Sequence, residues 1–178
     1  MSTTSAPTKV LGVINSRMMA ACRASTAEKA IFSDLRDHEV IHRDFFKAAI
    51  ATGRITDGLV PDFSGIDFTL RLSAAGAPKL GVLNAARAFE DLGVAAYNGA
   101  GRFISNADYL TLTGKIVSVE ARHAAIIREL ITPNTFVGAD VVDITTTGLE
   151  RSKRPPVVLE TANKYLAAGS KLSANAFA

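Results

Sequence analysis

The sequence contains few of the residues that would direct a chain to an oxidising compartment or into a bilayer. Its 178 residues include a single cysteine, Cys22, so no disulfide can form within the chain. The longest uncharged apolar runs fall far short of the roughly 20 residues that a transmembrane helix needs. We therefore expect neither a disulfide framework nor a membrane partner.

An excess of charge of one sign is also lacking. The 20 basic and 17 acidic residues give a net charge of +3. Arg151, Lys153 and Arg154 form the only tight basic cluster, and such a cluster is usually solvated surface. Binding to nucleic acid requires an extended basic face. We therefore do not expect a nucleic-acid partner.

The N-terminal stretch lacks the unbroken apolar core of a signal peptide. The segment KVLGVINSRMMAAC ends in a lipobox-like position at Cys22, but Asn15, Ser16 and Arg17 interrupt it. A secretory h-region has about 7 to 15 apolar residues. We expect no export through this segment and a cytoplasmic location by default.

A first long helix is predicted where apolar residues recur at steps of three and four. Ser25 and Glu28 have capping-box spacing at its start, and Gly53 ends it. Its core-facing stripe occupies about 80° of arc. The stripe consists of Ile31, Leu35, Glu39, His42, Phe46 and Ala49.

Two further helices follow the same pattern. The second is predicted over about 78–104, and the third over 107–131, after a cap at Ser105 or Asn106 and before Pro133. The second stripe consists of Leu83, Ala86, Glu90, Val94, Tyr97, Gly101 and Ile104. The third consists of Tyr109, Ile116, Glu120, His123, Ile127 and Leu130.

These helices define a predicted all-α domain over residues 1–132, with a long crossover at 53–77. Residues 133–178 are predicted to form an irregular C-terminal arm, in which Pro155 and Pro156 favour a short helix near 156–167.

Charged and imidazole side chains lie in the middle of all three apolar stripes. Glu39 and His42 share the first stripe, Glu120 and His123 share the third at the same spacing, and Glu90 lies in the second. Carboxylates buried without compensation cost several kcal/mol. Two Glu-x-x-His helices with single-glutamate helices are typical of carboxylate-bridged dinuclear bundles. The pattern predicts iron or manganese, as a pair or a single ion, although oxygen and imidazole ligands also suit zinc.

The segment HEVIH also fits the His-Glu-x-x-His signature of zinc peptidases, with His38 and His42 as ligands. That site needs a third ligand further along the chain. No Gly-x-x-His extension follows His42, and the remaining histidine, His123, belongs to the second Glu-x-x-His. The peptidase is the weakest of the alternatives.

Three stretches give the chain its resemblance to a known family. AEKAIFSDLRDHEVIHRDFFKAAI, AARAFEDLGVAAYNGAG and IVSVEARHAAIIREL resemble the ferritin-like domain proteins of the desiccation-related group. The resemblance covers about 27–130 and implies a ferritin-like four-helix bundle. By residue matching, it implies metal ligands at Glu39, His42, Glu90, Glu120 and His123. Members of this group are often exported.

The sequence departs from this family at its N-terminus. The spacing between Glu90 and Glu120 places the expected partner of Glu39 near Lys9, and residues 1–27 contain no Asp or Glu. The first helix is therefore predicted to be short or incomplete. Three alternatives follow: a site with one ion or a weakened pair, a site completed by a neighbouring chain, or a scaffold without metal chemistry.

Two functions remain open at this stage. The first is a metal-binding protein that oxidises iron or handles peroxide in stress protection. The second is a structural protein that forms a homo-oligomer or filament through its open bundle face and C-terminal arm, because large exposed apolar faces are rare on monomers. The sequence does not decide whether the protein is an enzyme.

Overall fold

A computed structural model of the chain describes residues 24–55 and 57–177. These residues form helices and isolated β-bridges but no β-strand, which confirms the predicted all-α class. They divide into two compact units. The first contains the described residues up to Val82 together with Tyr165–Lys171, and the second contains Leu83–Lys164 and the tail from Leu172. The predicted incomplete first helix precedes Ala24 and lies outside the described residues.

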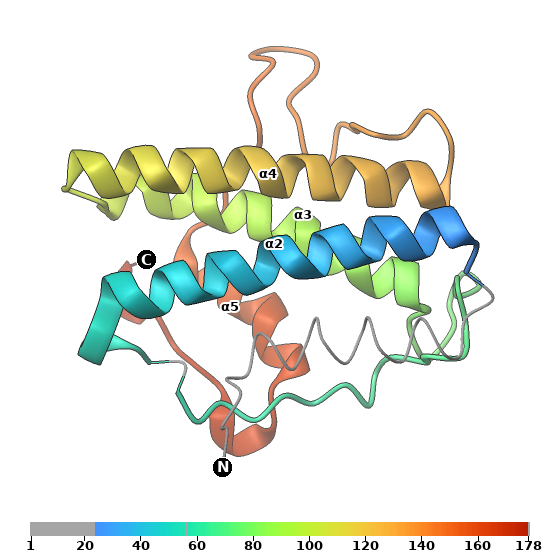
Figure 1. Cartoon of the computed structure of the whole chain (residues 1–178), viewed down its shortest axis with the longest axis horizontal. Coiled ribbons are helices and arrows are strands. Elements are labelled where there is room, and N and C mark those ends of the chain that lie inside the picture. The colour runs from blue at the N-terminus through green and yellow to red at the C-terminus, as the bar shows by residue number, and fades with distance from the viewer. Residues whose placement is uncertain (1–23, 56, 178) are drawn as a thin grey trace. The chain divides into compact units, whose positions relative to one another are not determined.

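The first unit contains α2 (Thr26–Ile50), drawn in blue to cyan in Figure 1. The predicted capping box is present: the Glu28 backbone N–H donates to the Ser25 hydroxyl, and the Ser25 N–H donates to the Glu28 carboxylate at 2.8 Å. Arg71 also donates to Glu28, at 2.7 and 2.9 Å. The hydrogen bond from Ser25 and then the Arg71 guanidinium hold the pKa of Glu28 below its ordinary value, against the effect of burial. Glu28 therefore joins the start of α2 to the segment that follows the helix.

The segment between α2 and the next helix is irregular, as predicted, but it extends further along the chain. Leu80 forms a parallel bridge with the buried Ile66, and its backbone N–H donates to the Gly65 carbonyl. These bonds exclude a helix at Leu80. The following helix therefore begins at Val82 and not near residue 78.

The second unit is organised around two antiparallel helices, α3 (Val82–Ala100) and α4 (Ala107–Ile131). They run side by side in Figure 1, joined by a short connection in which the Asn106 side chain caps α4. The bounds of α4 agree with the prediction. Buried apolar residues of the two helices form the core of this unit: Leu83, Ala85, Ala86, Leu92, Val94, Ala95, Ile116, Ala124 and Ile127.

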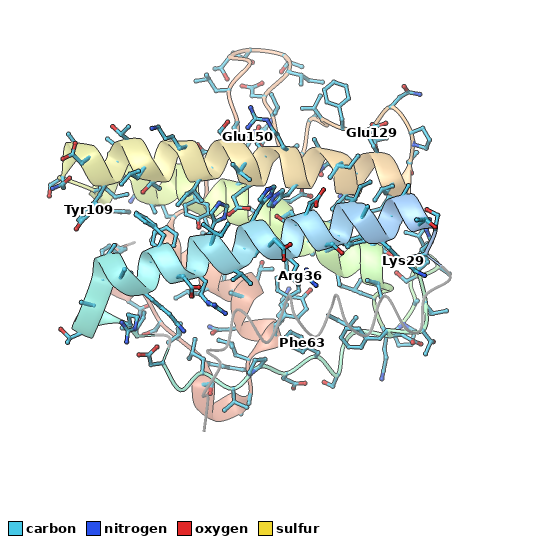
Figure 2. The ribbon with its side chains drawn as sticks, viewed as in Figure 1. Lys29, Arg36, Phe63, Tyr109, Glu129 and Glu150 are labelled. Carbon is cyan, nitrogen blue, oxygen red and sulfur yellow. The ribbon has the colours of Figure 1, made fainter. Side chains whose placement is uncertain are left out.

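The arm after α4 is irregular and is held to both helices. The Glu129 carboxylate accepts hydrogen bonds from the backbone N–H groups of residues 134–136, which lowers its pKa. The arm then makes an antiparallel bridge between Val142 and Glu150. Figure 2 shows Glu129 near the end of α4 and Glu150 on the arm.

The end of the arm passes against α3. The Lys153 N–H donates to the Ala95 carbonyl, and a Cβ atom on Gly99 would lie 1.8 Å from the Lys153 carbonyl oxygen. Glycine is therefore required at position 99. The helix α5 (Pro155–Ala162) follows, close to the predicted 156–167. The predicted domain boundary at residue 132 stays a prediction.

No helix in the described part of the chain has the length and apolar character that crossing a bilayer requires.

Candidate metal centre

Three of the five predicted ligands lie together in the second unit. Glu90 comes from α3, and Glu120 and His123 come from α4. The Nδ1 atom of His123 is 3.2 Å from Oε2 of Glu120 and 3.5 Å from Oε2 of Glu90. One potential ligand atom of each residue lies within 4.8 Å of the others. The structure therefore brings two carboxylates and one imidazole into a single group.

This group lies in the apolar interface between the two helices. The side chains of Glu90, Glu120 and His123 are 7%, 5% and 4% exposed. The i, i+3 spacing places Glu120 and His123 on one face of α4, between the buried residues Ile116 and Ile127. Apolar spacing along α4 is thus what directs these polar groups inward.

The group has the chemical properties of a cation site. Two carboxylates in low-dielectric surroundings favour a nearby positive charge, because burial penalises each negative charge. Carboxylate oxygens and an imidazole nitrogen, without a thiolate, are ligands suited to iron, manganese or zinc. These residues fit a divalent metal ion.

The other two predicted ligands lie on α2, in the first unit. His42 Nδ1 is 3.8 Å from Glu39 Oε1, and the two side chains are 12% and 21% exposed. His38 is exposed. Glu39 and His42 therefore form a second, more accessible Glu-x-x-His pair, and His38 is set apart from it by its exposure. The assignment of all five residues as ligands stays a prediction.

The family comparison bears on both pairs of Glu-x-x-His residues. The model of the ferritin-like domain family matches residues 8–133, which include α2, α3 and α4. The chain belongs to the ferritin-like domain family. No curated protein and no solved structure matches the sequence. The family match and the buried Glu/His group are both compatible with metal binding.

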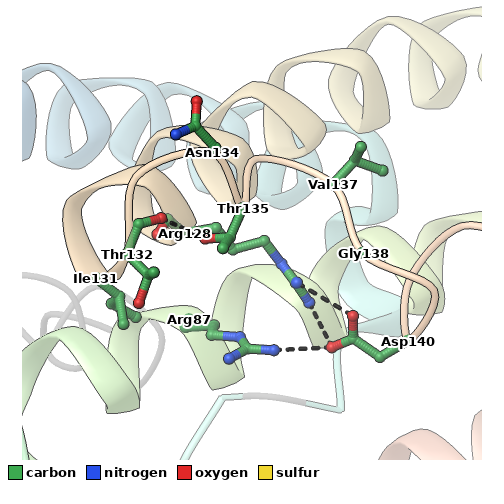
Figure 3. A pocket seen from close by; sticks show the side chains of 9 residues that line it. All are labelled: Arg87, Arg128, Ile131, Thr132, Asn134, Thr135, Val137, Gly138 and Asp140. Atoms are coloured by element: carbon green, nitrogen blue, oxygen red, sulfur yellow. Dashed lines mark hydrogen bonds and ion pairs between the residues drawn. The ribbon is translucent and has the colours of Figure 1, made fainter.

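A charged network beside the centre was not predicted from the sequence. Arg128 of α4 is 4% exposed and donates to both oxygens of Asp91, at 2.9 and 2.7 Å. It also donates to Asp140 of the arm, at 3.2 and 2.8 Å. Arg87 donates to Asp140 at 2.8 Å (Figure 3). A basic residue directly after the stripe residue Ile127 was the only available sequence signal.

The network fixes the ionisation of its members. Burial acts to lower the pKa of Arg128, but its hydrogen bonds with Asp91 and Asp140 outweigh that effect and raise the pKa above its ordinary value. The Arg128 hydrogen bond lowers the pKa of Asp140 from 3.8 to about 2. Arg128 and Asp140 are therefore both charged at neutral pH.

Proposed function

We propose that this ferritin-like domain binds a pair of iron or manganese ions and handles oxygen or peroxide in stress protection. The observation that carries the proposal is the buried group of Glu90, Glu120 and His123 within a ferritin-like sequence. Glu39 and His42 are proposed as the ligands that α2 contributes. A bound pair of such ions would supply the electrons that reduce oxygen or peroxide.

The protein groups have separate roles in this proposal. Glu90 and Glu120 supply negative charge that compensates the cations, and the apolar interface limits the access of water to them. Glu39 and His42 are proposed to contribute further ligand atoms, and their side chains are 21% and 12% exposed. The absence of Asp and Glu from residues 1–27 leaves five ligands where a complete site of this type has six. The two ions are therefore expected to bind with unequal affinity.

The test is the metal content of the purified protein, measured by elemental analysis. Wild type is expected to hold about one or two iron or manganese ions per chain. Glu39→Ala should hold fewer, whereas His38→Ala, which changes the exposed histidine of the same helix, should match wild type. Wild type that stays free of metal after incubation with Fe²⁺ or Mn²⁺ would refute the proposal.

A second candidate function is self-assembly without turnover. It is favoured by large apolar residues exposed on the arm, where Phe136, Ile144 and Leu149 are 60%, 60% and 68% exposed. Exposed apolar residues that gather on one segment are typical of contact surfaces. We propose a homo-oligomer or filament formed through the arm. Light scattering coupled to size exclusion tests this, and a monomer at every concentration would exclude it.

We also propose, more specifically, that the chain belongs with the desiccation-related group of ferritin-like proteins. This proposal is supported by the three matching stretches of sequence, of which AEKAIFSDLRDHEVIHRDFFKAAI is the longest. Survival of a deletion strain under drying and under peroxide, with and without the Glu39→Ala gene, would separate a stress function from one unrelated to stress.

A further inference from the structure

The ion pair between Asp91 and Arg128 lies close in sequence to the buried Glu/His group. On α3 it is one residue from that group, and on α4 it is little more than one helical turn away. Asp91 directly follows Glu90, and Arg128 is five residues beyond His123. The pair is bidentate, with Nε and Nη2 of Arg128 each donating to a different oxygen of Asp91. Such a fork permits only a narrow range of relative positions for the two helices.

The burial of Arg128 makes it costly to break the ion pair with Asp91. Arg128 is 4% exposed, so a shift of α3 along α4 would separate a buried guanidinium from the Asp91 carboxylate. The apolar contacts between the helices tolerate small shifts, because they have no preferred direction. The register of Glu90 against His123 therefore depends on this directional contact beside them.

The arm closes over the same guanidinium. Asp140 takes the remaining side of Arg128 and also accepts from Arg87. A Cβ atom on Gly138 would lie 2.6 Å from Oδ1 of Asp140 and 3.3 Å from Nη1 of Arg128, so a larger residue there would require these side chains to shift. These residues line a pocket of about 260 Å³ (Figure 3). Because aspartates already occupy both guanidinium edges of Arg128, we interpret the contacts as a clamp and not as an anion site.

We infer that Asp91 and Arg128 are positioning residues, which set the register of α3 and α4 and so place Glu90 beside His123 for metal binding. The part concerning metal rests on the proposed function. Ligands must be held within about 0.5 Å of the productive geometry. Outer residues that orient metal ligands typically change affinity 10- to 100-fold.

The experiment compares a double variant with wild type. Asp91→Leu combined with Arg128→Met replaces the buried ion pair by apolar side chains of similar size, an exchange that commonly preserves stability. We expect a melting temperature near that of wild type, but an affinity for Mn²⁺ that is about 10-fold weaker or worse, measured by calorimetry. Arg122→Met, which removes an exposed arginine of the same helix, should bind as wild type does. A stable double variant with wild-type affinity would overturn the inference.

A measurement without metal separates this inference from the proposed function. NMR contacts between the His123 ring and the Glu90 methylenes report the register in metal-free protein. They should weaken in the double variant and be partly retained in Arg128→Lys, which keeps the charge but not the fork. Wild type that binds no Mn²⁺ refutes the proposed function alone, and the register is then decided by these contacts. Unchanged contacts in the double variant refute the positioning role.

Discussion

The two Glu-x-x-His pairs have the same spacing but very different surroundings. On α4, Glu120 and His123 are almost completely buried and have Glu90 as a third member. On α2, Glu39 and His42 are 21% and 12% exposed, and Nδ1 of His42 lies further from its carboxylate partner, at 3.8 Å from Oε1 of Glu39. The comparison teaches that a motif fixes which groups can share a face, whereas the neighbouring elements decide how strongly those groups are desolvated. We expect the α4 pair to contribute more to metal affinity than the α2 pair.

The largest expected effect is on metal content. Glu120→Ala with His123→Ala should reduce bound Fe or Mn to the background level, because it removes two of the three buried side chains that we propose as ligands. Glu39→Ala with His42→Ala should reduce the content but leave a measurable amount. Elemental analysis of both variants after identical loading is the test. Equal losses would mean that burial does not distinguish the two pairs.

The next effect is stabilisation by metal. A ligand that binds only the folded state, present at about 100 times its Kd, adds about 2.7 kcal/mol to the free energy of unfolding. Thermal melting with Mn²⁺ should show this gain in wild type and none of it in Glu120→Ala with His123→Ala. The variant altered at Glu39 and His42 should lie between them. His38→Ala serves as the control and should behave as wild type does.

A smaller effect is expected on the stability of the metal-free protein, where loss of a proposed ligand should stabilise the fold. Glu90 and Glu120 are buried around one imidazole, so replacing Glu90 by Gln relieves the desolvation and repulsion of one carboxylate. We expect Glu90→Gln to stabilise chelator-treated protein by about 1 kcal/mol, as at other sites where function costs stability. Glu39→Gln should change the free energy of unfolding by less than about 0.5 kcal/mol. Urea unfolding measures both, and a destabilised Glu90→Gln would contradict the expectation.

The smallest effect concerns the arm of the second unit at low pH. The pKa of Asp140, about 2, lies below its ordinary value of 3.8, so its contribution to stability is complete above about pH 4. That contribution is lost as the pH falls towards about 2. Because the Asp140 side chain is 55% exposed, screening limits it to about 1 kcal/mol or less. Urea unfolding at about pH 5 and pH 2.5 should show a smaller loss in Asp140→Asn than in wild type or in Asp37→Asn of α2, because other carboxylates with lowered pKa values, such as Glu28 and Glu129, lose their contribution in all three proteins.

Local signals were sufficient to predict much of the fold. The capping box at Ser25 and the cap at Asn106 placed the starts of α2 and α4, because caps depend on residues three positions away. The start of α3 was predicted four residues too early. It is decided by the bridge between Ile66 and Leu80, a contact that no local pattern in 78–82 encodes.

The residues of the candidate site could also be predicted from local sequence patterns. The contacts of Arg128 beside the site could not. Glu90, Glu120 and His123 stand out because polar residues interrupt an apolar stripe. Arg128 stands beside the stripe, where basic residues are usually solvated. Its burial depends on Asp140, which reaches it from an irregular arm whose path follows no periodicity.

The short connection between α3 and α4 also has a consequence for the order of events during folding. Glu90, Glu120 and His123 all belong to one helical hairpin, and hairpins of this kind form quickly because their contacts are local in sequence. The three donors are therefore expected to meet at an early step. During synthesis, residue 131 emerges from the ribosome before the arm does, so a nascent chain would expose a nearly complete set of donors while its clamp is still missing. The donors that we propose to bind metal would then be most accessible to metal ions while the protein is being synthesised.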